Sequence, residues 1–171
     1  QNDSVLSFPP IINGNHTTVK NSTKDFFIDV TGWDPRACEC SLLLVCLELA
    51  ARGGKVESVE INDCNNQKII TPNGNPIKHE LTDRLLESML GKKFTEEDLS
   101  NAINRMGGRF LGITDAPLDS LEIAMKMSDV IVGDKIIEIE MPRWRFDILH
   151  PIDLVEEIAI GHGYESLGTD V

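Results

Sequence analysis

The stretch "RWRFDILHPIDLVEEIAIGHGY", residues 143–164, decides how the second half of this 171-residue chain is expected to fold. After Pro151, apolar residues recur at helical spacing, and Gly163 follows the last of them. This pattern predicts a helix from about residue 152 to residue 162. Its predicted buried face consists of Leu154, Val155, Ile158 and Ala159. The residues before Pro151 are predicted to be extended and to bend at the proline.

Four carboxylates gather around the start of this predicted helix: Asp147, Asp153, Glu156 and Glu157. Asp153, Glu156 and Glu157 stand at positions i, i+3 and i+4, so they are predicted to share the face opposite the apolar one. Asp147 comes from the preceding extended segment. Mg²⁺ prefers oxygen ligands in octahedral geometry and keeps several waters, so acids from two adjacent segments suit such an ion.

The same acids also fit an ordinary helix start. Asp153, with Glu156 three residues later, resembles a capping arrangement, and the helix dipole favours acids in a first turn. Arg143 and Arg145 are close enough in sequence to neutralise the acids by ion pairs, which contribute little when exposed. The spacing alone does not choose between a metal site and a capped helix.

The segments before this stretch predict an α+β module with helices followed by a small sheet. "TDRLLESMLG" (82–91) and "TEEDLSNAINRMG" (95–107) each begin with a capping threonine and end near a glycine, which predicts two short helices. The second helix is expected to bury Leu99, Ala102, Ile103 and Met106. "DVIVGDKIIEIEM" (129–141) predicts a hairpin around Gly133. Residues 108–128 give no clear pattern.

The first part of the chain predicts a β-α-β-β order. Residues 4–12 and "FFIDVTG" (26–32) read as strands, and Asp34 with Pro35 opens a helix to about Arg52. A strand is expected over 55–61. A Pro-Asn-Gly turn then separates two short extended runs.

Composition excludes several classes of protein. Sixteen basic residues and 28 acidic ones give a net charge of −12, and aromatic residues make up 5% of the chain. Both values argue against a principal nucleic-acid-binding surface in this chain. The four cysteines are too few and too irregularly spaced for a disulfide scaffold, so reduced thiols are expected. No apolar run reaches membrane-spanning length and no signal peptide pattern is present. The start at Gln1 suggests a piece of a longer protein.

The stretch "MPRWRFDILHPIDLVEEIAIGHGYESL" resembles the end of the B5 domain in β subunits of phenylalanyl-tRNA synthetases, in particular those of the archaeal and eukaryotic branch. The matching residues are Pro142, Arg145, Asp147, Ile148, Asp153, Leu154, Glu156, Glu157, Gly163 and Tyr164. "SFPPIINGNHT" and "FIDVTGWD" resemble the closing part of the B3/B4 editing domain of the same subunits. The resemblance implies an α+β chain in which residues 1–76 end a B3/B4 α/β domain. Residues 77–171 then form a winged-helix-like B5 domain.

The resemblance also implies a cytoplasmic enzyme of two α and two β subunits that charges tRNA(Phe) with phenylalanine. By this resemblance, the whole enzyme uses ATP, but the piece represented by this chain does not bind it. The piece is also expected to carry no catalytic residue and to make no contact with a membrane. Asp147, Asp153, Glu156 and Glu157 match acids associated with a magnesium ion shared with the α subunit. Asp29 and Thr31 match an acid and a hydroxyl of the editing pocket.

Two other functions remain open on the sequence. A winged-helix-like module in another protein would bind nucleic acid, although the net charge argues against it. A metal-dependent hydrolase would use the acid cluster, but neither His150 nor His162 is well placed to assist it.

Overall fold

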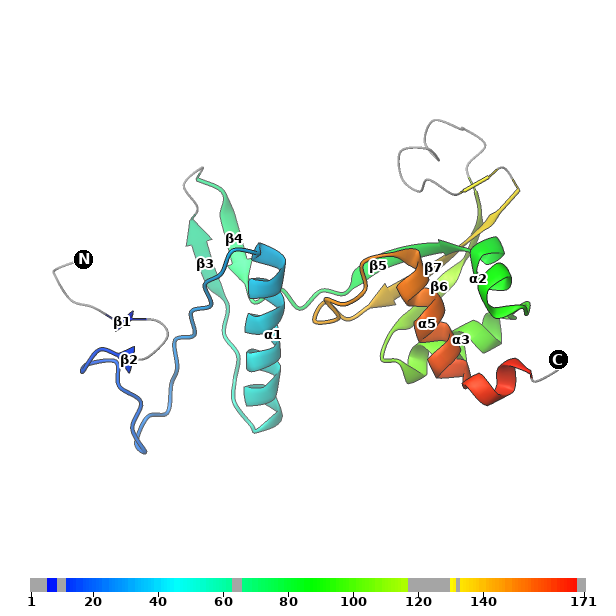
Figure 1. Cartoon of the computed structure of the whole chain (residues 1–171). Helices are drawn as coiled ribbons and strands as arrows, with labels where there is room; N and C mark the ends of the chain where they lie inside the picture. The colour runs from blue at the N-terminus through cyan, green and yellow to red at the C-terminus, as the bar shows by residue number, and fades with distance from the viewer. Residues whose placement is uncertain (1–5, 9–11, 63–65, 117–129, 132, 169–171) are drawn as a thin grey trace.

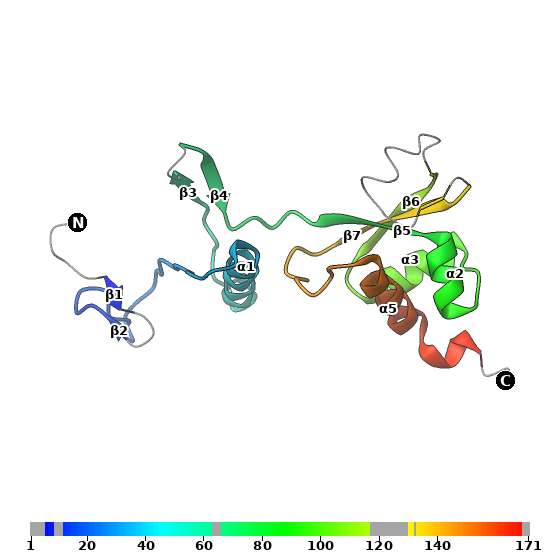
Figure 2. The same ribbon diagram turned by 45° about the horizontal axis from the view of Figure 1, so that its top comes forward.

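The computed structural model describes residues 6–8, 12–62, 66–116, 130–131 and 133–168. Within these residues the chain forms two parts joined by an extended stretch between β4 and β5 (Figures 1 and 2). The second part holds most of the buried core. The predicted mixture of helices and small sheets, an α+β fold, is confirmed.

The first part is built around one long helix, α1 (Pro35–Ala51). As predicted, Asp34 caps it by accepting a hydrogen bond from the Arg36 N–H, and Pro35 takes the first helical position. The other elements are two antiparallel pairs, β1 (Ser7–Phe8) with β2 (Ile12–Asn13), and β3 (Val59–Asn62) with β4 (Lys68–Thr71). β3 therefore begins four residues later than the sequence indicated.

The strand predicted over residues 26–32 is wrong. These residues have no regular secondary structure, and Phe27 is 80% exposed. A strand needs a neighbour to take its backbone hydrogen bonds, and no described strand pairs with this segment. The apolar pattern alone was therefore a poor guide. The strand predicted over 4–12 lies partly outside the described residues. Within that range, Ser7–Phe8 form β1 and Ile12 begins β2.

The second part is a three-stranded antiparallel sheet with helices on one face (Figure 1). The strand order is β5 (Ile77–Thr82), β7 (Lys135–Met141), β6 (Arg109–Asp115). The helices are α2 (Asp83–Leu90), α3 (Glu96–Arg105) and α5 (Pro151–His162), followed by the short 3₁₀ helix η1 (Tyr164–Leu167). Thr82 and Thr95 cap α2 and α3 as predicted.

The predicted hairpin over 129–141 is replaced by a single central strand. β7 pairs with β5 on one side and β6 on the other, and the described residues Val130 and Ile131 are not in a strand. Residues 129 and 132, and 117–128 of the unassigned span, lie outside the described residues. Four of the seven β7 residues are buried, which a central strand explains and an outer hairpin does not.

The core lies between this sheet and its helices. Its fully buried side chains are Leu81, Leu99, Ile103, Ile137, Ile139, Met141, Leu154 and Ile158. α3 and α5 cross in close contact, because Gly161 on α5 has no side chain to keep Ala102 of α3 away. This packing fixes α5, and therefore the carboxylates at its start.

Candidate functional site

The start of α5 is capped by His150, with Asp153 as its reciprocal partner. The Nδ1 atom of His150 accepts a hydrogen bond from the Ile152 N–H at 3.2 Å. The Asp153 carboxylate accepts from the backbone N–H groups of Leu149 and His150, at 2.8 and 2.7 Å. Asp153 does take part in capping, but as the third helical residue opposite the cap His150, whereas the sequence suggested Asp153 as the cap with Glu156 as its partner. One predicted metal ligand is thus occupied in holding the helix start.

The prediction that Glu157 and Glu156 share an exposed face is wrong. Glu157 is 7% exposed, whereas Glu156 is exposed. Residues 154, 157 and 161 follow one another at i, i+3 and i+7 along the same side of the helix, so the buried face is wider than its apolar residues alone indicated.

Arg145 neutralises the buried Glu157. The two terminal nitrogens of its guanidinium donate to the two carboxylate oxygens of Glu157, at 2.8 Å from Nη1 and 2.6 Å from Nη2. Such paired, charge-assisted bonds are among the strong hydrogen bonds of proteins. They give a carboxylate at the edge of an apolar core a partner for both of its oxygens.

The same guanidinium also binds Asp147. Its Nε lies 2.9 Å from one oxygen of Asp147, and its Nη2 lies 2.7 Å from the other. Hydrogen bonds from Arg145 hold the pKa of Asp147 below its ordinary value, and bonds to Glu157 and then Asp147 raise the pKa of Arg145. The Asp147 side chain is still 59% exposed, so it faces solvent as well as Arg145.

The four predicted metal ligands therefore do different things in this structure. Asp147 and Glu157 bind one cationic side chain, Asp153 caps α5, and Glu156 points to solvent. Among the described residues, no three or more His, Cys, Asp or Glu side chains are grouped to hold a metal ion. As they stand, these residues do not fit magnesium, because the space between Asp147 and Glu157 is filled by Arg145. The magnesium site stays a prediction.

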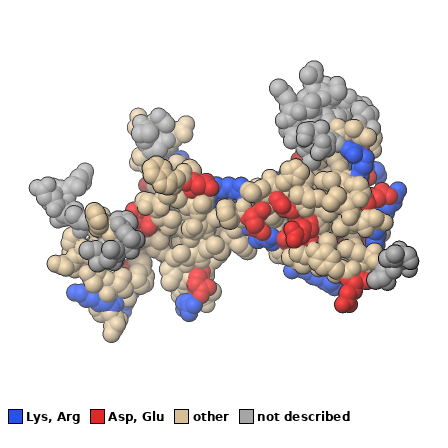
Figure 3. Space-filling model, in the orientation of Figure 1, with Lys and Arg blue, Asp and Glu red and all other residues tan. Residues whose placement is uncertain are grey.

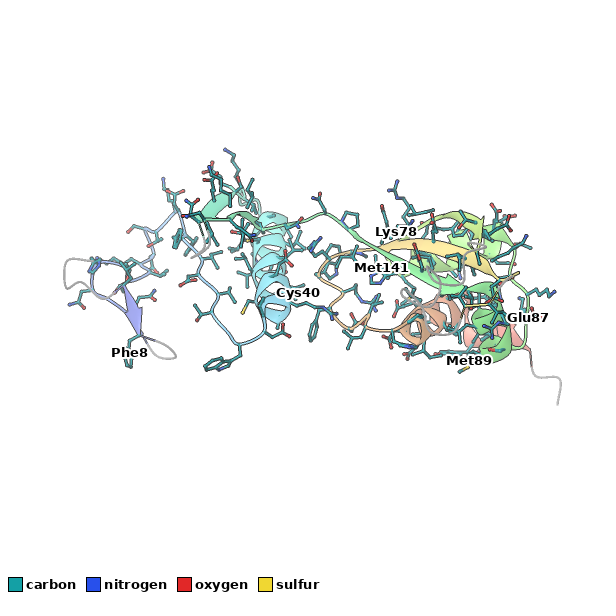
Figure 4. The ribbon with its side chains drawn as sticks, turned by 90° about the horizontal axis from the view of Figure 1, so that it is seen from above. Phe8, Cys40, Lys78, Glu87, Met89 and Met141 are labelled. Carbon is teal, nitrogen blue, oxygen red and sulfur yellow. The ribbon has the colours of Figure 1, made fainter. Side chains whose placement is uncertain are left out.

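The loop between β7 and α5 is also held by α1, an interaction that no sequence pattern predicted. Arg143 lies 3.3 Å from Glu39 of α1 rather than on the acid cluster, as had been expected. The Cys40 thiol donates to the Arg143 carbonyl at 3.2 Å. The Arg36 guanidinium donates to the Phe146 carbonyl. Seen from above, Cys40 on α1 lies beside this loop (Figure 4).

The surface around this loop combines acids with exposed apolar side chains. Acidic side chains gather where the loop meets the start of α5 (Figure 3), and the exposed acids there include Asp147 and Glu156. Trp144, Phe146 and Leu149 are 39%, 49% and 69% exposed. Neighbouring exposed aromatic and aliphatic groups of this kind are typical of surfaces that contact another protein.

The two predicted editing residues lie outside this cluster. Asp29 and Thr31 are exposed and belong to the irregular segment that precedes α1. Their role in a pocket stays a prediction. No helix among the described residues is long and apolar enough to cross a membrane.

Comparison with known proteins identifies what this arrangement is similar to. The family model for the tRNA synthetase B5 domain matches residues 79–164. The phenylalanine–tRNA ligase beta subunit of Methanococcoides burtonii is 39% identical over 166 residues, which are 97% of this chain and 27% of that protein. The corresponding subunit of Methanosarcina acetivorans is 38% identical over 170 residues, 99% of this chain and 28% of that protein. The chain thus spans about a quarter of the length of these relatives.

A solved structure shows the same fold. An N-terminal fragment of the phenylalanyl-tRNA synthetase beta subunit from Pyrococcus horikoshii matches with a TM-score of 0.69 and 28% identity. The match covers 93% of this chain and 40% of that one. The similarity therefore includes both parts of the chain and is not confined to the residues of the family model.

Proposed function

The chain belongs to the tRNA synthetase B5 domain family, and from this we propose that it serves as a section of the β subunit of a phenylalanine–tRNA ligase. The family model and the relatives' names support this proposal. We propose that this section carries no catalytic residue and acts as a structural and interface element. Activation of phenylalanine with ATP and its transfer to tRNA(Phe) would be carried out by the whole enzyme.

One observation carries the proposal. The matched residues 79–164 enclose both the folded core and the loop on which Arg145 joins Asp147 to Glu157. The side chains of this network bind one another, so they are not set up to attack or protonate a substrate. The exposed Trp144, Phe146 and Leu149 beside it suit burial against a partner protein.

Further details follow from the family and are proposals for this chain. We propose two α and two β subunits, a cytoplasmic location, and contact with tRNA(Phe) through the whole enzyme. We also propose that the chain divides into the end of a B3/B4 domain (1–76) and a B5 domain (77–171). Asp29 and Thr31 are proposed to contribute to an editing pocket for mischarged tRNA.

We also propose, from the family resemblance and under one condition, a magnesium ion shared with the α subunit. Its ligands in this chain would be Asp147, Asp153, Glu156 and Glu157. Asp147 and Glu157 would first have to separate from Arg145, and Asp153 from the backbone N–H groups that it binds. We assign the ion no step in the reaction.

The partner can be tested directly. The full-length native protein would be purified from its source at low salt, and its mass measured under conditions that keep complexes intact. We expect a complex with a second, different subunit in equal number. A protein that stays alone, or that assembles only with copies of itself, would contradict the proposal.

The same preparation discriminates the alternative of a nucleic-acid-binding module. Phosphate contacts by basic residues make binding strongly salt-dependent. With a net charge of −12, this section is expected to contribute little to such binding. Salt-dependent retention of the protein on random DNA, without any second subunit, would favour the alternative.

A further inference from the structure

We propose that Arg36 is a positioning residue that fixes the backbone around Asp147, so that α1 of the first part sets the geometry of the carboxylate-bearing loop of the second. This loop is residues 142–148. The inference rests on the proposed function, because it concerns the loop that bears Asp147. The contacts from which it is argued are all within this chain.

Arg36 contacts the backbone on both sides of Asp147. Its Nη2 atom donates to the carbonyl oxygen of Phe146 and lies 3.5 Å from the carbonyl oxygen of Ile148. These are the residues directly before and after Asp147. The guanidinium carbon also lies 5.6 Å from the centre of the Phe146 ring, within the range of a cation–π contact. One planar side chain thus contacts the backbone on both sides of Asp147.

The place of Arg36 is not explained by the stability of α1 itself. It follows Pro35 in the first turn of the helix, where the dipole favours acids and disfavours cations. The contacts to the loop provide the compensating interaction. An arginine also suits this task better than a lysine, because its planar group presents several donors in a fixed geometry.

The beginning of the loop is fixed to the first part as well. The Nε of Arg143 donates to the Asn75 carbonyl at 2.9 Å, and its Nη1 lies 3.3 Å from Glu39 of α1. The Arg143 carbonyl accepts from the Cys40 thiol at 3.2 Å. On the other side, Arg145 binds Glu157 of α5. The loop is therefore held between α1 and α5, as their positions in Figures 1 and 2 also show.

A side chain about 110 positions away in the sequence thus acts on the backbone that flanks Asp147. A change at Arg36 is therefore expected to alter the backbone around Asp147.

Hydrogen–deuterium exchange on the whole chain tests the inference. The N–H groups of Arg145 and Phe146 bond to carbonyls within the loop, so their exchange reports on its order. Arg36→Gln should speed exchange in peptides covering 143–149 by about tenfold, the effect of losing one hydrogen bond to a charged group. Peptides from α3 should not change. Arg52→Gln is the matched control, because the side chain of Arg52, at the other end of α1, pairs with the exposed Glu48 of the same helix.

Unchanged exchange in the loop of Arg36→Gln would overturn the inference. If that variant also loosens residues 43–49 of α1, Arg36→Lys takes its place, since it keeps the charge but not the planar group. Faster loop exchange with α1 unchanged would then support the inference, and loop exchange equal to wild type would overturn it. The exchange experiment contains no partner or substrate, so a negative result there speaks only against the role of Arg36. Failure of the proposed function would instead appear as a missing second subunit in the purified native protein.

Discussion

Arg145 in the loop and Glu157 on α5 are joined by two hydrogen bonds of 2.6 and 2.8 Å between guanidinium and carboxylate. The Glu157 side chain is 9% exposed and that of Arg145 is 20% exposed. The pair is therefore largely removed from solvent. Loss of either partner would leave a poorly solvated charge, which is costly.

Glu157→Gln should destabilise the chain by roughly 3 kcal/mol, at the lower end for a broken buried ion pair, because Arg145 keeps its bonds to Asp147. Urea unfolding measures this loss. Glu156→Gln makes the same change at the next, exposed position and should stay within about 0.5 kcal/mol of wild type. An equal loss of unfolding free energy in the two variants would show that the ion pair between Arg145 and Glu157 does not stabilise the fold.

The free energy of unfolding should depend on the ionisation of Asp147. Its pKa is lowered in the folded state from the ordinary 3.8, chiefly by hydrogen bonds from Arg145. Its contribution to stability is therefore fully present above pH 3.8 and is lost as the pH falls through the lower, folded-state pKa. Asp147→Asn should remove this part of the acid dependence.

The measurement is the difference between wild type and Asp147→Asn in unfolding free energy, followed from pH 6 down to acid. The difference is needed because the pKa values of Asp98 and Asp134 are lowered too. We expect the gap between the two proteins to narrow as the pH drops. A constant gap would mean that Asp147 titrates as it does in the unfolded chain.

Gly161→Ala should destabilise the contact between α3 and α5. A Cβ at this position would lie 2.1 Å from the Ala102 carbonyl oxygen, so the helices would have to move apart. Overpacking of this kind costs about 1–3 kcal/mol. Gly74→Ala is the control, since its Cβ would meet nothing within 4 Å. Thermal unfolding of both variants should show a lower melting temperature for Gly161→Ala only.

Magnesium should not stabilise the chain in the absence of a partner, because Arg145 occupies Asp147 and Glu157. Unfolding would be compared in magnesium chloride and in sodium chloride of equal ionic strength, since salt alone screens ion pairs. Arg145→Met frees both acids and should gain stability from magnesium. A magnesium-specific increase in wild type would show that the carboxylates gather around the ion without a partner.

Sequence patterns predicted the helices well, because each of them carries its own start signal. Thr82, Thr95 and the pair Asp34-Pro35 mark helix starts that the structure confirms. The strands were harder, since a strand depends on neighbours distant in the chain. The segment 26–32 has a strand-like composition but no described partner, while β7 takes partners on both sides rather than folding back as a hairpin.

The sequence pointed to the carboxylates around the start of α5 but not to their arrangement. Spacing placed Asp153, Glu156 and Glu157 on one side of a helix, but it could not show that the side chain of Glu157 lies buried at the edge of the core. The binding of Arg145 to the acids was foreseen as an alternative and is confirmed. The contacts of Arg36 with the loop were not foreseen, because they join residues about 110 positions apart and no local pattern encodes such a pair.

Phenylalanine-dependent exchange of pyrophosphate into ATP tests the central claim most directly. The assay would use the full-length native protein, purified from its source together with its partners. We predict exchange that requires phenylalanine and is present only in fractions containing a second subunit. Absence of exchange from a preparation that contains the intact protein, with no second subunit attached, would contradict the assignment to a phenylalanine–tRNA ligase.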